Sequence, residues 1–207
     1  MLTGKKIVLG VSGGIAAYKM ANVASMLSKL HADIHVVMTE NATHFITPET
    51  FEVLTGNHCY TDTFDRCLEL HVPHIALGTQ ADAILIAPAS ADVVGKIANG
   101  IADDMLTTCV LPATCPVMLA PSMNVHMYEN PIVQDNMKKL ASYGYEIIEA
   151  DEGYLACRDI GKGKLPPEHV LVDYIIRACA MDKDLTGKKV LVTAGATQES
   201  IDPVRYI

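Results

Sequence analysis

One cysteine in a glycine-rich stretch is the residue of this sequence best placed to do chemistry. Residues 153–166 read GYLACRDIGKGKLP, which puts Cys157 among three glycines. Gly161 and Gly163 allow backbone angles that other residues resist. We therefore predict a lid, rather than a settled helix or strand, that closes over a substrate. A thiol on this lid can be a nucleophile, an acid or a metal ligand.

A second glycine-rich motif follows the first apolar run of the chain. Residues 10–15 read GVSGGI, and a helical pattern begins after them. Main-chain N–H groups at a helix start, together with the Ser12 hydroxyl, can bind an anion. The loop lacks the dinucleotide pattern G-x-G-x-x-G, and the second strand ends in Thr39 before Glu40. A hydroxyl suits a phosphate better than a ribose, which favours a mononucleotide such as FMN over NAD.

The same loop has two other interpretations. It matches G-x-S-x-G, the nucleophile elbow of α/β hydrolases, with Ser12 as the nucleophile. Such a serine normally lies within a larger sheet and is followed by its Asp and His partners, whereas Ser12 follows the first strand. The loop can also be a plain glycine-rich turn without a ligand.

Asn124 lies in a polar segment after a short apolar run. Residues 121–131 read PSMNVHMYENP. The Asn124 amide can donate a hydrogen bond to a carboxylate, or it can cap the next helix, and the sequence leaves both roles open. Met123 and Met127 are four residues apart, a spacing that favours packing over chemistry.

The histidines and the remaining polar clusters are less specific. His71 and His74 lack a second pair of Cys or His residues at zinc-binding spacing, so we expect no metal. His44 and His126 are spare candidates for catalysis. Residues 88–92 (PASAD) and 103–108 (DDMLTT) either cap helices or line a ring system with hydroxyl and backbone donors.

The elements that must position these residues alternate between strands and helices. We predict strands at 5–11, 34–38, 83–87, 117–120 and 147–148, and helices at 15–30, 41–54, 90–99, 103–110, 131–143 and 166–181. This alternation predicts a doubly wound parallel sheet in three α/β/α layers, Rossmann-like or flavodoxin-like. Ligands of such folds bind beyond the carboxyl ends of the strands.

The composition narrows the class of protein. The net charge of −8 over 207 residues argues against nucleic-acid binding. Six cysteines without C-x-x-C spacing suggest a reducing compartment, and no apolar run is long enough for a membrane span, so we expect a cytoplasmic protein. The motif LTGKK at residues 2–6 recurs at 185–189. We predict one domain at 1–181, with a linker and the first strand of a truncated second domain at 182–207.

Four motifs in this order resemble the homo-oligomeric flavin-containing cysteine decarboxylases. They are residues 12–15 (SGGI), 88–92 (PASAD), 121–127 (PSMNVHM) and the lid around Cys157, and the resemblance covers residues 4–180. The chain is most similar to the members that decarboxylate 4′-phosphopantothenoylcysteine in coenzyme A biosynthesis. Residues 197–205 (TQESIDPVR) resemble the opening of the synthetase half found in bifunctional members.

The resemblance implies a reaction and its residues. An FMN-dependent enzyme would convert 4′-phosphopantothenoylcysteine to 4′-phosphopantetheine by transient thiol oxidation, decarboxylation and re-reduction. His74 and Cys157 would be catalytic, with Cys157 as the proton donor, because a thiol with a pKa of about 8.5 is protonated at neutral pH. Asn124 would bind the substrate carboxylate. Other implied substrate contacts are Met127 and Lys164, and implied FMN contacts are Ser12, Gly13, Gly14, Ile15, Thr39, Ser90, Ala91, Met105 and Thr107.

The family pattern also implies partners, and the chain departs from it at two places. The implied assembly is a trimer or a dodecamer of trimers, with the flavin near a subunit interface. Lys164 stands where relatives often have arginine, which loses a bidentate donor, and Arg158 stands where many have glycine.

Three related functions compete with the decarboxylase. The cysteine lid argues against a flavin prenyltransferase, and the synthetase-like tail argues against a peptidyl-cysteine decarboxylase. The presence of His74 and Cys157 argues against a flavin-binding regulatory protein.

Overall fold

The apolar runs of the sequence become the strands of one parallel sheet. The computed structural model describes residues 1–64, 72–154, 156, 158–180, 184–185, 187–193 and 195. Its main sheet has the order β3-β2-β1-β4-β5-β6 with every pair parallel. The strands are β1 (Lys6–Val11), β2 (Asp33–Met38), β3 (Cys59–Tyr60), β4 (Ala83–Ala89), β5 (Val117–Pro121) and β6 (Glu146–Ile147).

This order confirms the predicted fold class. It is the Rossmann order of a doubly wound sheet, and without the two-residue β3 the remaining five strands run in the flavodoxin order. The chain reverses its direction of travel across the sheet between β1 and β4. A doubly wound sheet binds its ligands at this switch point, outside the carboxyl ends of the strands.

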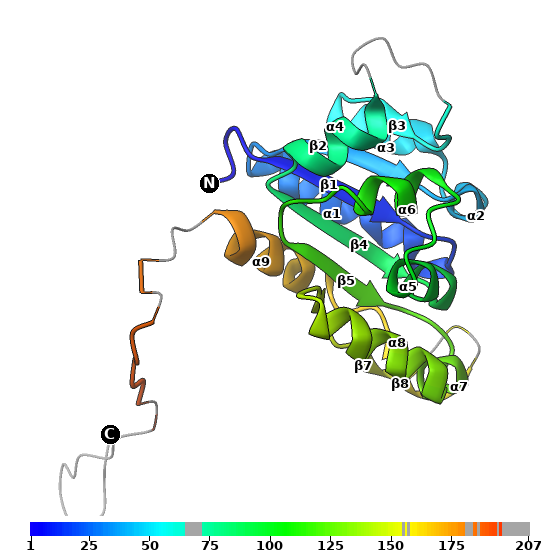
Figure 1. Ribbon diagram of the computed structural model, residues 1–207, viewed down its shortest axis with the longest axis vertical. Helices are drawn as coiled ribbons and strands as arrows, with labels where there is room; N and C mark the ends of the chain where they lie inside the picture. The colour runs from blue at the N-terminus through cyan, green and yellow to red at the C-terminus, as the bar shows by residue number, and fades with distance from the viewer. Residues whose placement is uncertain are drawn as a thin grey trace, which may run out of the picture.

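Helices cover both faces of the sheet and make the three layers (Figure 1). One face packs against α1 (Lys19–Lys29), α3 (Pro48–Thr55) and α9 (Glu168–Cys179), and the other against α4 (Pro73–Gln80), α5 (Ala91–Ala98), α6 (Met105–Val110) and α8 (Pro131–Ser142). The 3₁₀ turn η1 (Ile15–Tyr18) precedes α1, and the short helices α2 (Glu40–Thr43) and α7 (Val125–Tyr128) follow β2 and β5.

The strands are buried on both faces, so their side chains alternate between two apolar layers. In β1, Ile7 and Leu9 point to the face of α1, and Val8 points to the other face. Gly10 also lies on that second face, where a Cβ atom would be only 2.5 Å from Leu106 Cδ1. The missing side chain therefore lets α6 pack directly on β1.

The single helix predicted at 41–54 is wrong. The segment forms α2 and α3, with Thr47 in an extended conformation between them at φ −84° and ψ 149°. Pro48 explains the break, because it has no N–H group and disfavours helical geometry in the residue before it. Proline is instead well suited to the first turn of α3. The strand β3 was also missed, because two residues are too short to show an alternating pattern.

The prediction that residues 153–166 form neither helix nor strand is also wrong. Much of the segment belongs to an antiparallel hairpin of β7 (Asp151–Tyr154) and β8 (Ile160–Lys164). Cys157 lies outside the described residues. Arg158, where the resemblance expects glycine, has φ 72°, in the left-handed region that favours glycine.

The hairpin glycines allow close packing against the loop before α7. The Met123 N–H donates to the Gly163 carbonyl at 3.0 Å. A Cβ atom on Gly163, whose φ is +142°, would collide with the Met123 carbonyl oxygen. A Cβ atom on Gly161 would lie 2.6 Å from Val125 Cγ2. The glycines are therefore needed at least as much for docking as for conformational freedom.

The described residues of the C-terminal tail, 184–185, 187–193 and 195, belong to neither a helix nor a strand. The strand predicted there, and the domain boundary at 181, stay predictions. Among the described residues, no helix is both long and apolar enough to span a membrane.

We expect Gly163→Ala to weaken hairpin docking. The added methyl group meets a backbone atom and forces a strained φ, which costs about 1–3 kcal/mol. Urea unfolding should show this loss of unfolding free energy, and limited proteolysis should cut the hairpin faster than in the wild type.

The matched control is Gly95→Ala in α5. A Cβ atom there lies 3.7 Å from Asn136 Nδ2, an ordinary contact, so the change should stabilise the helix by about 0.5–1 kcal/mol. A Gly163→Ala protein with wild-type stability and protease resistance would contradict the close-packing account.

Candidate active site

Two adjoining cavities lie at the carboxyl edge of the sheet. The hairpin cavity, of about 470 Å³, lies between the loop after β1, the start of α5, the loop before α7 and the β7–β8 hairpin. The α5 cavity, of about 380 Å³, lies between the loop after β1, the start of α2 and α5. Both have the size of small-molecule sites. They share the wall residues Gly13, Ser90, Ala91 and Met127.

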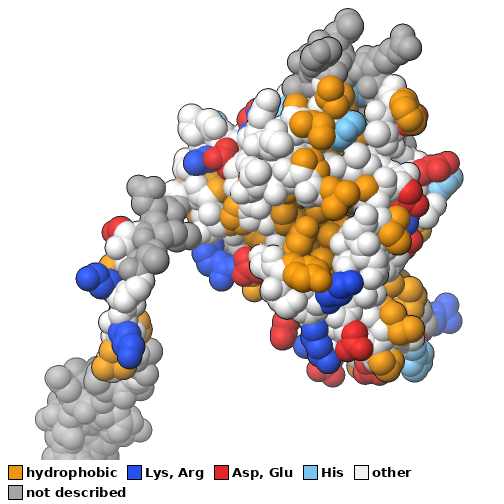
Figure 2. Space-filling view, in the orientation of Figure 1, with side chains coloured by type: hydrophobic (Ala, Val, Ile, Leu, Met, Phe, Trp, Pro, Cys, Tyr) orange, Lys and Arg blue, Asp and Glu red, His pale blue; other side chains and the backbone are white. Residues whose placement is uncertain are grey.

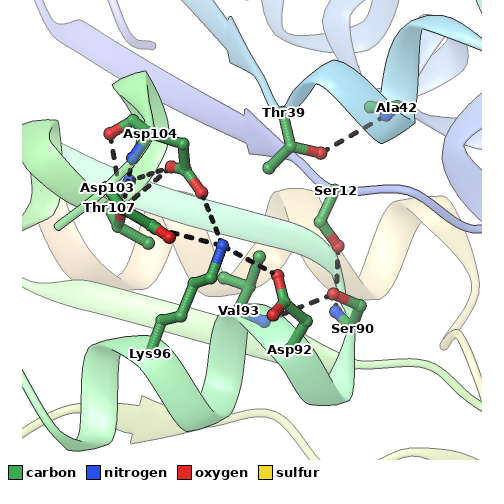
Figure 3. Close-up of polar contacts among 10 residues, drawn as sticks. All are labelled: Ser12, Thr39, Ala42, Ser90, Asp92, Val93, Lys96, Asp103, Asp104 and Thr107. Atoms are coloured by element: carbon green, nitrogen blue, oxygen red, sulfur yellow. Dashed lines mark hydrogen bonds and ion pairs between the residues drawn. The ribbon is translucent and has the colours of Figure 1, made fainter. Parts of the chain in front are cut away.

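Ser12 holds together the two loops that build these cavities. Its hydroxyl donates to the Pro88 carbonyl at 2.7 Å. It also accepts from the Ser90 N–H at 2.9 Å (Figure 3). The side chain is 0% exposed and lines neither cavity. This burial does not fit the exposed nucleophile of a hydrolase elbow. The phosphate contact predicted for Ser12 stays a prediction, and its one proton is already donated within the protein.

The loop after Ser12 offers main-chain donors. Within the described part of the chain, the N–H groups of Gly13, Gly14 and Ile15 form no hydrogen bond, and these residues line the hairpin cavity. A Cβ atom on Gly13 would be 2.5 Å from Asn41 Cβ, so glycine is required where the loop passes α2. A run of unpaired N–H groups beside a cavity is suited to an anion.

Two hydroxyl groups and a helix start face the same space. Thr39 caps α2 by accepting from the Ala42 N–H at 3.3 Å, and it lines the α5 cavity. Ser90 caps α5 by accepting from the Val93 N–H at 3.4 Å, and it lines both cavities with Ala91. The positive end of the α5 dipole therefore adds to the attraction for an anion.

The opposite wall of the α5 cavity carries one lysine among three carboxylates. Lys96 Nζ lies 3.0 Å from Asp103, 3.2 Å from Asp92 and 3.4 Å from Asp104 (Figure 3). Burial alone would lower the pKa of Lys96, but the hydrogen bonds that its ammonium donates to Asp103 and Asp92, together with the charges of Asp92 and Asp104, outweigh it, so the pKa is raised. The ammonium therefore stays charged and ties the 103–104 loop to α5.

Met105 and Thr107 lie beside this cluster but line neither cavity. Both are 1% exposed. Thr107 forms a capping box with Asp104, whose carboxylate accepts from the Thr107 N–H at 2.8 Å. The flavin contacts predicted for these two residues stay predictions.

Asn124 caps a helix, as one of its two predicted roles requires, and the ligand contact stays a prediction. Its Oδ1 accepts from the His126 N–H at 2.8 Å and caps α7. Its Nδ2 donates to the carboxylate of Asp159 at 3.0 Å, and the residue lines the hairpin cavity. The side chain thus already binds a carboxylate, one that belongs to the protein.

The remaining predicted substrate residues also lie at these cavities. Lys164, on β8, lines the hairpin cavity, and Met127 lines both cavities. The packing role assigned to Met127 from its spacing is wrong, because the side chain is 48% exposed. Met123, by contrast, packs on the core and also lines the hairpin cavity.

His74 is the predicted residue that the structure does not bring to the others. It lies in the first turn of α4 and lines neither cavity. Its Nδ1 atom is buried without a hydrogen-bond partner in the described residues. The chain alone therefore does not place His74 beside Asn124.

Several wall residues of the hairpin cavity were missed by the sequence analysis: Tyr18, Lys19, Ser122, Tyr154 and Leu165. Lys19 could have been found from the sequence. It follows the glycine loop and begins α1, where the helix dipole disfavours a cation, so its position there suggests a functional role. The described residues give it no ion pair, and α1 has no acidic residue in its first turn. The described residues contain no group of three or more His, Cys, Asp or Glu side chains that could hold a metal ion.

The fold and the loop define an α/β protein with a candidate anion site at the switch point of its sheet. Comparison with known families identifies the class of protein. Residues 1–180 match the flavoprotein family, and residues 185–207 match the C-terminal domain of DNA/pantothenate metabolism flavoproteins. The chain belongs to the flavoprotein family, which supports a flavin as its cofactor.

Relatives of the chain are bifunctional proteins. It is 48% identical over 208 residues to the coenzyme A biosynthesis bifunctional protein CoaBC of Bacillus subtilis, and 42% identical over 206 residues to that of Escherichia coli. Each match covers 100% of this chain and 51% of the relative. The chain thus spans about half the length of these relatives.

Solved structures of decarboxylases share the fold. A cysteine-to-serine mutant of PPC decarboxylase, in complex with pantothenoylaminoethenethiol, is 30% identical with a TM-score of 0.73, over 83% of this chain and 96% of that one. The FMN-dependent cysteine decarboxylase SpaF is 34% identical with a TM-score of 0.70, over 84% of this chain and 99% of that one.

We expect Thr39→Val to weaken flavin binding by about tenfold, the effect of losing one hydrogen bond to a charged phosphate. Valine keeps the shape of threonine but removes the hydroxyl that lines the α5 cavity. Fluorescence titration of flavin into the flavin-free apoprotein measures the change in the dissociation constant.

Two companion variants test whether the hydroxyl of Thr39 in particular is needed. Thr39→Ser keeps the hydroxyl and should bind flavin as the wild type does. Thr43→Val removes the other threonine hydroxyl of α2, which donates to the Glu40 carbonyl and lines neither cavity, and it should have no effect. Equal flavin affinity in Thr39→Val and wild type would remove Thr39 from the site.

Proposed function

We propose that this chain is the FMN-dependent decarboxylase that converts 4′-phosphopantothenoylcysteine to 4′-phosphopantetheine in coenzyme A biosynthesis. The observation that carries the proposal is the amide of Asn124, which binds a carboxylate on the wall of a cavity continuous with the anion loop. The family supports a flavin, and the FMN-dependent relative SpaF supports FMN in particular.

The FMN phosphate binds at the loop between the two cavities. The N–H groups of Gly13, Gly14 and Ile15 and the Thr39 hydroxyl are donors there, and the start of α5 adds a positive potential. Ser90, Ala91 and Met127, which line both cavities, would hold the ring system. Bound FMN supplies a reversible hydride acceptor next to the substrate thiol.

Transient oxidation of that thiol makes loss of CO2 feasible. A thioaldehyde next to the carboxylate-bearing carbon accepts the electron pair that the departing CO2 leaves behind, which gives an enethiolate. A proton on one carbon of the enethiolate and return of the hydride to the other would then give the saturated thiolate, which a further proton converts to the product thiol, without net oxidation. Asn124 binds the carboxylate until this step.

Three further residues contribute to the reaction. Cys157 gives the proton to carbon, a role that rests on the resemblance because the residue lies outside the described ones. Lys164, on the wall of the hairpin cavity, and Lys19, opposite it on α1, are cations suited to the charged ends of this substrate.

His74 acts from a neighbouring copy of the chain. It lines neither cavity, so its catalytic role requires an assembly, a trimer or a dodecamer of trimers, that brings it to another copy's flavin. The face covered by α4 and α6 supports such contacts. Figure 2 shows apolar side chains gathered there, and exposed ones include Ile75 and Leu111.

The two family matches, to residues 1–180 and 185–207, support the proposed domain division. Residues 1–181 are the decarboxylase domain, and residues 182–207 are a linker and the start of a synthetase domain, whose ligase activity belongs to the rest of that domain. The decarboxylase works in the cytoplasm.

We expect the purified protein to be yellow and to release CO2 from 4′-phosphopantothenoylcysteine, one molecule per molecule of 4′-phosphopantetheine formed. The absorption spectrum detects the flavin, and mass spectrometry of the product detects the mass loss. A protein that carries flavin and binds this substrate but releases no CO2 would contradict the proposed reaction.

The matched variant is Cys157→Ser, which keeps the size of the side chain but lowers its acidity. It should still release CO2 and then stop before the saturated product, because the final proton is missing. Normal formation of 4′-phosphopantetheine by this variant would remove Cys157 from the role of acid.

A further inference from the structure

The amide that is proposed to bind the substrate carboxylate already binds Asp159. Asn124 Nδ2 lies 3.0 Å from Asp159 Oδ2 in a partly buried hydrogen bond. The two residues are 35 positions apart, on the loop before α7 and on the hairpin. This contact therefore joins the hairpin to the proposed substrate site.

Two partners of Asn124 among the described residues determine which end of the amide meets the carboxylate. The His126 N–H is a donor, so it requires the amide oxygen, and the carboxylate of Asp159 is an acceptor, so it requires the NH2 group. A substrate carboxylate would need the same NH2 group.

We propose that Asp159 is an internal competitor for the substrate carboxylate at Asn124, and that it thereby lowers the preference of the site for carboxylated substrate over decarboxylated product. This inference rests on the proposed decarboxylation. The substrate must displace Asp159 from the amide in order to bind, whereas the product has no carboxylate and leaves the Asn124–Asp159 contact intact.

Electrostatic repulsion favours replacement of Asp159 by the substrate carboxylate over simultaneous binding of both carboxylates to Asn124. Two carboxylates on one amide group would be two negative charges a few ångströms apart in a partly buried place, where their repulsion is weakly screened. The Asn124 amide therefore accepts one carboxylate at a time.

The exchange needs only a local movement. The stem of the hairpin is held by the Met123–Gly163 hydrogen bond and by the close packing of Gly161 on Val125. Asp159 precedes β8, next to Ile160, which is 77% exposed and so is not packed in the core. The carboxylate can leave Asn124 while the rest of β8 stays docked.

Decarboxylation reverses the exchange of the Asp159 carboxylate for the substrate carboxylate at Asn124. Loss of CO2 removes the group that displaced Asp159, so the Asp159 carboxylate returns to Asn124 once decarboxylation has occurred. The site is then closed to a second carboxylate until Asp159 is displaced again, and the product is left without its strongest polar anchor. The Asn124 amide thus binds the substrate carboxylate before decarboxylation and the Asp159 carboxylate after it.

The test compares substrate and product in variants of Asp159. Asp159→Asn keeps the shape but offers a neutral, weaker acceptor, and Asp159→Ala removes the acceptor. We expect KM for 4′-phosphopantothenoylcysteine to fall by about threefold to tenfold, more in the alanine variant, the effect of losing one competing hydrogen bond. The inhibition constant of 4′-phosphopantetheine should not change.

The control is Asp151→Asn, which removes the same charge from an exposed position on β7 of the same hairpin. It should leave both constants at their wild-type values. Flavin content and circular dichroism verify that each variant is folded.

Two results would overturn the proposal. A rise in KM would show that Asp159 orients Asn124 for the substrate instead of competing with it. Unchanged KM in both Asp159 variants would show that the contact plays no part in recognition.

The failure of the proposed function would look different. If the wild-type protein released no CO2, the decarboxylation would be wrong, whatever the variants did. The same ligands can then be compared by calorimetric dissociation constants, since an inactive protein does not consume them. Tighter binding of the carboxylated ligand alone, in Asp159→Asn and not in Asp151→Asn, would still support the exchange.

Discussion

The buried hydroxyl of Ser12 is the interaction on which the site depends. It joins the carboxyl ends of β1 and β4 by donating to Pro88 and accepting from Ser90, at the switch point of the sheet. Burying a hydroxyl is costly unless it is hydrogen-bonded, so this arrangement strongly favours one relative position of the two loops. The N–H groups that follow Ser12 and the capped start of α5 are thereby held around one space, which both cavities share.

The rest of the site is arranged around the Ser12 hydrogen bonds by close packing of backbone segments and by ion pairs. Glycine at 13, 161 and 163 lets backbone segments pass where a side chain would collide. Lys96 holds three carboxylates that would otherwise repel one another beside an anion site. Asn124 connects α7 to the hairpin through its two hydrogen bonds. A flavin phosphate, a ring system and a substrate carboxylate can thus lie in sequence along one edge of the sheet.

The sheet and the glycine-rich turn after β1 were predictable, because buried parallel strands are continuous apolar runs and adjacent glycines mark a turn. Pro48 was sufficient to predict the break between α2 and α3, but the apolar pattern across it was misleading. The hairpin was missed because its glycines suggested a conformationally free backbone. In the structure they instead permit close packing against the loop before α7 and against α7 itself. Packing between elements, which no local pattern encodes, decides the remaining features. It buries Ser12, Met105 and Thr107, and it leaves His74 outside the walls of the cavities.

A crystal structure of the flavin-loaded protein tests the central claim most directly, because it locates the phosphate. The account predicts phosphate oxygens about 3 Å from the N–H groups of Gly13, Gly14 or Ile15 and from the Thr39 hydroxyl, with Ser12 still hydrogen-bonded to Pro88 and Ser90. A phosphate bound instead at Lys19, with the N–H groups of the loop facing solvent, would contradict it.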